Sequence, residues 1–238
     1  STLLASSAAS DVYKRQMLTY CLNENHSQNR AKENDMPTEV LSYYLKNEDR
    51  KVRLGFQVIL QCAPFLKGLK VSGLISMENE LYFELEEMFS GMEINFHKLS
   101  CSKGKCLVLF YRPKELEEYM NQSKLWKLIR QYGYKKGSIE EMLIHLSTRV
   151  CDCDKQGNGF PHEIGAFLGY PMADVQSFIE KDGKDFIMTG YWKVYSNPEK
   201  ARMIFHEYDR AKVCAVNEYL DGKNIREIAL NQRKWRNL

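Results

Sequence analysis

The chain has 238 residues, of which 44% are hydrophobic and 27% are charged, and these proportions are ordinary for a folded protein with one main core. Its formal net charge of +3 comes from mixed acidic and basic residues, which argues against a dedicated nucleic-acid binder, so no nucleic-acid partner is predicted. No apolar run approaches the roughly 18 residues that cross a membrane, so no membrane partner is expected either.

The N-terminal sequence is not typical of a folded domain. Residues 1–16 are similar to a translated library-adapter scar, and Met17 is the expected start; the alternative, a signal peptide, lacks a basic leader and a continuous apolar centre. Residues 17–36 are rich in Asn, Gln, Glu and Lys, which predicts a flexible arm. We therefore expect one domain over residues 37–222 and a basic tail over residues 223–238.

Hydrophobic spacing predicts the elements of the N-terminal half. They are a helix from Thr38, a helix over 52–64, a strand over 71–77, an acidic helix over 78–90, and strands over 93–100 and 106–112. The last two strands are joined by a loop, residues 101–105, that contains Gly104, as expected of a hairpin. Residues 106–111 of the last strand, Cys-Leu-Val-Leu-Phe-Tyr, are all apolar, which indicates a central position in the sheet.

After Pro113 the pattern is helical almost to the end of the chain. Ser138 and Glu141 have the spacing of a capping box, and Asn197-Pro198 is expected to start the longest helix. The predicted fold class is therefore α+β, with a small sheet of about three strands in the N-terminal half, covered by helices, and a mainly helical C-terminal half.

The segment Phe160–Pro171 has the clearest pattern of the chain. Pro161 suits the first position of a helix, and Glu163 then falls in the first turn, where negative charge favours the helix dipole. Gly169-Tyr170-Pro171 ends this helix, and apolar spacing predicts a second helix that ends near Gly183.

His162, Glu163 and Cys62 are the candidates for catalytic chemistry. An imidazole at a helix N-terminus is able to act as an acid, a base or a ligand, whereas in the structural alternative His162 hydrogen-bonds a nearby loop and Glu163 only stabilises the helix end. Cys62 lies near Lys67 and Lys70, which would stabilise a thiolate, whereas a buried cysteine is the structural alternative. If Cys62 and His162 meet, they form a nucleophile and its base.

The aromatic segment around Trp192 is a candidate binding surface. In an extended segment Tyr191, Lys193 and Tyr195 share one side, which would stack against a planar cofactor or base. The structural alternative is that the aromatic residues pack an irregular segment onto the core.

Two other patterns are weaker. Cys101 and Cys106, with Cys151 and Cys153, suggest a zinc site, but neither pair has the CxxC spacing, so no metal site is predicted. The scattered cysteines instead indicate reduced thiols in the cytoplasm. The two helices around Gly169-Tyr170-Pro171 suggest a helix-turn-helix, but acidic residues on the second helix, Asp174 among them, would repel phosphates.

Three stretches together, residues 160–171, 190–195 and 62–64, resemble a known family. Over roughly 38–222 the chain is similar to the bacterial proteins catalogued as domain of unknown function 3793. Gly68-Leu69-Lys70 also matches, whereas Phe65 replaces a Thr and Ser72-Gly73 replaces Ala-Asn. The family has no established reaction, so the resemblance implies no catalytic activity. It implies a cytoplasmic bacterial protein and favours a link to iron or redox metabolism.

Three functions remain open at this point. The favoured one is a binding or accessory protein for a small molecule or cofactor, with a pocket formed by Cys62, Lys70, His162, Glu163, Tyr191, Trp192 and Lys193. The alternatives are an enzyme that uses Cys62 or His162/Glu163, and a protein-interaction module without a pocket.

Overall fold

The computed structural model describes residue 44 and residues 46–156 and 160–230. The predicted leader, the arm, most of the helix from Thr38 and the end of the basic tail lie outside the described residues. The elements in chain order are α3 (Arg50–Leu66), β1 (Ser72–Glu78), the 3-10 turn η1 (Asn79–Leu81), α4 (Glu84–Met88), β2 (Asn95–Ser102), β3 (Lys105–Tyr111), α5 (Pro113–Met120), α6 (Ser123–Ile129), η2 (Arg130–Tyr132), α7 (Ile139–Gln156), α8 (Ile164–Phe167), α9 (Met172–Glu180), β4 (Met188–Thr189), β5 (Lys193–Val194), α10 (Pro198–Leu220) and α11 (Ile225–Leu230).

The sheet in the N-terminal half is antiparallel and has the order β1-β3-β2, so the α+β class and the central position of β3 are confirmed. The β2–β3 turn is tighter than predicted. Lys103 and Gly104 form it with φ values of 49° and 75°, the left-handed conformation that two-residue hairpins require. Cys101 and Lys105 therefore belong to the paired strands and not to a loop.

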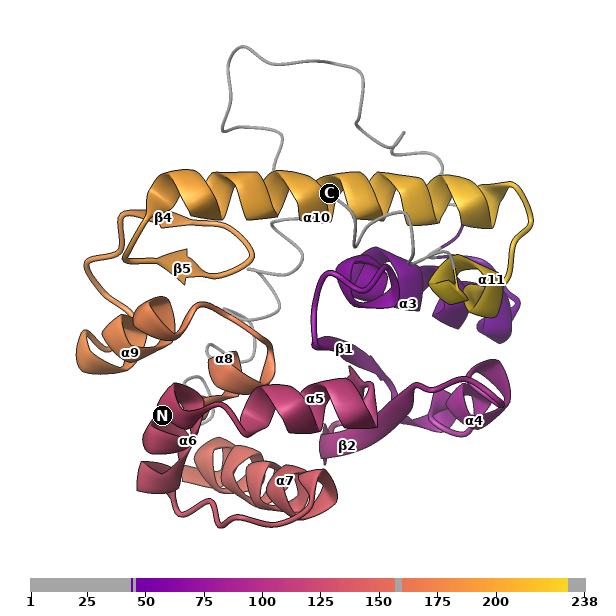
Figure 1. Cartoon of the computed structure of the whole chain (residues 1–238). Coiled ribbons are helices and arrows are strands. Elements are labelled where there is room, and N and C mark those ends of the chain that lie inside the picture. Colours follow the sequence, from indigo (N-terminus) through magenta and orange to yellow (C-terminus); the bar gives the residue numbers. More distant parts are fainter. Residues whose placement is uncertain (1–43, 45, 157–159, 231–238) are drawn as a thin grey trace, which may run out of the picture.

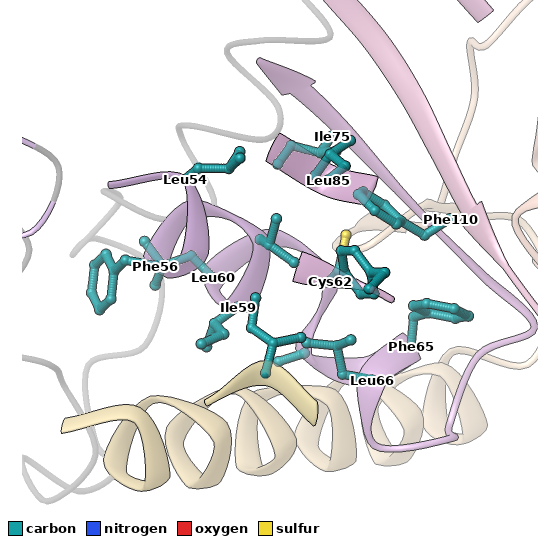
Figure 2. Packing of buried hydrophobic residues seen from close by; sticks show 14 of the residues in the cluster. Leu54, Phe56, Ile59, Leu60, Cys62, Phe65, Leu66, Ile75, Leu85 and Phe110 are labelled. Carbon is teal, nitrogen blue, oxygen red and sulfur yellow. The ribbon is translucent and has the colours of Figure 1, made fainter. Parts of the chain in front are cut away.

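Helices cover both faces of the sheet, as predicted (Figure 1). One face packs on α3, which in turn packs on α10 and α11; Figure 2 shows the α3 side chains with Ile75 and Phe110 of the sheet on one side and the α10 ribbon on the other. The opposite face, with Leu74 and Leu109, packs in a second cluster with residues of α5, α6, α7 and α8. The sheet thus separates two apolar clusters.

The C-terminal half is mainly helical, as predicted, but two of its features were not predicted. The half is not helical throughout, because β4 and β5 form a small hairpin that packs through Trp192 and Val194 on Phe205 of α10, in a third apolar cluster. The packed chain also continues beyond residue 222. Helix α11 buries Ile225 and Ile228 against α3, because these side chains share its apolar face.

Capping residues in the sequence predicted the starts of two helices correctly. The capping box is confirmed, since the Glu141 amide donates to Ser138 Oγ at 3.3 Å and the Ser138 amide donates to Glu141 Oε2 at 3.2 Å. Asn197 caps α10, the longest helix of the described part, by accepting a hydrogen bond from the Lys200 amide at 3.1 Å.

Candidate functional site

A cavity of about 190 Å³ lies where the three apolar clusters meet. Its wall comes from α3, β1, the segment before α8, α9, the β4–β5 connection and α10. Six of the residues proposed from the sequence line it: Cys62, Lys70, His162, Tyr191, Trp192 and Lys193. Segments separated by more than a hundred positions in the chain therefore share one hollow.

The turn before α8 places His162 at this cavity. The helix does not start at Pro161 as predicted; instead the Pro161 carbonyl accepts from the Ile164 amide at 3.1 Å, and α8 begins at Ile164. This tight turn leaves His162 at the wall, where its ring is nearly perpendicular to the ring of Phe178 at a centroid distance of 5.0 Å. His162 is partly exposed.

Glu163 points away from the cavity and does not line it, which corrects its predicted place in the pocket. Its side chain is fully buried and forms an ion pair with Arg149 of α7, in which Arg149 Nη2 lies 3.3 Å from Glu163 Oε2. The Tyr134 hydroxyl donates to the same carboxylate at 3.4 Å. The turn before α8 therefore brings His162 to the cavity and Glu163 into the core.

Cys62 is buried at the cavity wall and is not activated as a nucleophile. Burial raises the pKa of the Cys62 thiol to about 12, so the group is protonated at neutral pH. Lys67 does not stabilise a Cys62 thiolate, because its buried ammonium group forms an ion pair with Glu218 of α10. Gly73 on β1 permits this close packing: a Cβ atom there would lie 2.9 Å from Cys62 Sγ.

Lys70 brings a partly exposed ammonium side chain to the cavity wall. Its Nζ lies 5.1 Å from the ring centroid of Tyr170 and 6.0 Å from that of Tyr208, within cation–π range. Burial lowers the pKa of Lys70 to about 8, and the nearby Cys62 sulfur opposes this shift more weakly. Among the residues that the structure describes, no carboxylate forms an ion pair with Lys70.

Asp174 of α9 fixes the aromatic wall. It is buried, and its carboxylate accepts from Trp192 Nε1 at 2.8 Å and from the Tyr195 and Ser196 amides at 2.9 and 2.8 Å. Sequence reasoning treated Asp174 as a surface charge, which is wrong. Trp192 is consequently buried, whereas Tyr191 turns to α10 and is partly exposed.

Two lysines complete the charged part of the wall. Lys193 Nζ donates to the Gly183 carbonyl at 2.7 Å and lies 5.7 Å from the ring centroid of Phe178. Lys212 of α10 also lines the cavity, with Nζ 5.6 Å from the ring centroid of Tyr191. Sequence reasoning missed Lys212 because a lysine on a long helix normally indicates only a solvated face.

Two features are absent from the described part of the chain: a cluster of potential metal ligands and a membrane-spanning helix. No group of three or more His, Cys, Asp or Glu side chains is placed to hold a metal ion among these residues. None of the described helices has the length and apolar character needed to span a bilayer.

Comparison with known proteins gives one match. No curated protein and no solved structure matches the chain. The family model described as "Protein of unknown function (DUF3793)" matches residues 58–229, which include all seven residues proposed for the pocket. That range is more than half of the chain and covers the cavity wall from α3 to α10. The chain therefore belongs to this family.

Proposed function

We propose that the protein binds a small, planar and mainly apolar molecule that carries an acidic group, and that it does so in a bacterial cytoplasm. The observation that carries the proposal is the combination of aromatic rings and ammonium groups in one cavity. The free thiols of the described cysteines are consistent with this compartment. A link of the ligand to iron or redox metabolism remains part of the proposal.

The charges on the wall favour an anion. Lys70, Lys193 and Lys212 line the cavity, and Asp174 is the one carboxylate among its described lining residues. Because Asp174 already accepts hydrogen bonds from Trp192 and from two backbone amides, it offers little to a cationic ligand. A carboxylate on the ligand would supply the counter-charge that no described residue gives these three lysines through an ion pair.

The volume of the cavity and the aromatic rings in its wall favour a planar ligand. A cavity of about 190 Å³ is somewhat larger than an engineered cavity of about 150 Å³ that binds benzene, so one or two fused rings fit. Tyr170 and Trp192 lie 5.4 Å apart between centroids, and Phe178 and His162 contribute two further rings to the wall. Such surfaces stabilise flat aromatic molecules.

Isothermal titration calorimetry of the full chain with 2-naphthoate and 2-naphthamide tests the proposal, because these probes share their rings and differ in charge. We expect the acid to bind at least tenfold more tightly than the amide at pH 7. Replacing Lys212 with Met should reduce that preference severalfold, whereas Lys136→Met, at an exposed site outside the cavity, should not. Equal binding of the two probes, or binding of neither, would refute the proposal.

A further inference from the structure

We propose that Lys70 forms a covalent imine with an aldehyde or keto group of an acidic planar ligand. This inference rests on the proposed function, because the carbonyl compound must enter the same cavity. It adds a reaction to binding and assigns it to one amine.

The Lys70 side chain is only partly exposed, and it forms no ion pair among the described residues. Its Nζ lies near the rings of Tyr170 and Tyr208, and the residue lines the cavity together with Cys62. The ammonium form loses part of its hydration there and has no ion-pair partner among the described residues, and this outweighs the attraction of the two rings for the cation and favours the neutral amine. The neutral amine is the nucleophile in imine formation, and lysines in apolar pockets are activated in this way.

The pKa of Lys70, lowered by burial to about 8, agrees with this geometry. Cys62 does not compete for the carbonyl carbon, since burial raises the pKa of its thiol to about 12. Lys193 and Lys212 remain available as cations for the acidic group of the ligand. Lys70 thus adds to the positive charge of the wall while it is protonated, and after imine formation Lys193 and Lys212 remain as the cations for the acidic group.

The reaction is balanced without a further reactant. Lys70 Nζ attacks the carbonyl carbon, and the resulting carbinolamine loses its hydroxyl group. Both hydrogens of the neutral amine leave with the carbonyl oxygen as one molecule of water, and a carbon–nitrogen double bond remains. No oxidant or reductant is needed, and hydrolysis reverses the step.

Reductive trapping tests the inference on the full chain. The protein is treated with 4-formylbenzoate and cyanoborohydride, and peptide mass spectrometry locates the resulting secondary amines. We expect modification of Lys70 at least tenfold faster than that of the exposed Lys136 at pH 7.5, with a rate that rises to half its maximum near pH 8. A Lys70→Met variant that unfolds at a temperature no lower than the wild type should lose the fast adduct.

The outcomes separate this inference from the proposed function. If 2-naphthoate binds and also protects Lys70 from modification, both are supported. If 2-naphthoate binds but Lys70 reacts no faster than Lys136, the imine is refuted while the binding function stands. If Lys70 reacts fast although 2-naphthoate does not bind, the imine stands and the preference for planar acids is refuted.

Discussion

Replacing Lys70 with Met should stabilise the protein at neutral pH, although it removes a group of the proposed site. Burial lowers the pKa of Lys70 from its ordinary 10.5 to about 8, so the folded state is a poor environment for the ammonium form. At about 1.4 kcal/mol per pH unit this difference corresponds to about 3 kcal/mol. Because the residue as a whole is partly exposed, we expect a smaller gain of about 1–3 kcal/mol in the free energy of unfolding.

The stability gained by Lys70→Met should depend on pH in a defined direction. Between about pH 8 and pH 10.5 the unfolded state binds more protons at Lys70 than the folded state, so the wild type gains stability from this group as the pH rises. The advantage of Lys70→Met is therefore largest below pH 8 and shrinks above it. Urea unfolding at pH 7, 8, 9 and 10, under reducing conditions, measures the difference, with Lys136→Met as the control. A loss of stability in Lys70→Met at pH 7, or an advantage that does not change with pH, would show that the ammonium group is not desolvated.

Three further substitutions test the buried contacts around the site. Asp174→Asn should lower the free energy of unfolding in urea by about 1–3 kcal/mol, because an amide nitrogen facing Trp192 Nε1 leaves two hydrogen-bond donors opposed. Adding Trp192→Phe to this variant should then cost less than the same substitution costs in the wild type, and full additivity of the two effects would contradict this reasoning. Lys67→Met should lower stability by about 2–4 kcal/mol by leaving the largely buried Glu218 without its main partner, and Lys67→Met combined with Glu218→Leu should recover most of the loss in chemical denaturation. Ser138→Ala should cost about 1 kcal/mol by removing the cap of α7, as measured by thermal unfolding; a change below 0.3 kcal/mol would argue against the capping box, since caps contribute about 0.5–2 kcal/mol.

The parts of the fold that follow from local sequence were predictable. Asn197-Pro198 and the pair Ser138 and Glu141 determine helix starts through contacts within four residues, and the structure has both. The apolar strand β3 had to be central because both of its faces need cover. The β4–β5 hairpin was not predictable, because each strand has only two residues and packs chiefly through tertiary contacts with α10.

The membership of the cavity was only partly predictable. The sequence pattern placed His162 and Glu163 next to each other but did not determine which of them faces the cavity. That choice depends on Arg149, which pairs with Glu163 from the distant helix α7. Asp174 was misjudged for the same reason, since its hydrogen-bond donors lie 18 to 22 positions further along the chain. Side-chain direction at such sites follows from partners that periodicity does not reveal.

Buried charge elsewhere in the described part of the protein is consistently compensated, and this contrast gives Lys70 its significance. Lys67 pairs with Glu218, Glu163 pairs with Arg149, and Arg112 donates to the backbone carbonyls at the end of α3. Lys70 has rings and a protonated thiol around its ammonium group, but no carboxylate within the described residues forms an ion pair with it. A methionine in its place would pack against the same rings at lower cost in desolvation. Under the imine proposal, the stability that Lys70 costs is exchanged for a reactive amine at the cavity wall, a trade that is common where activity needs a destabilising group.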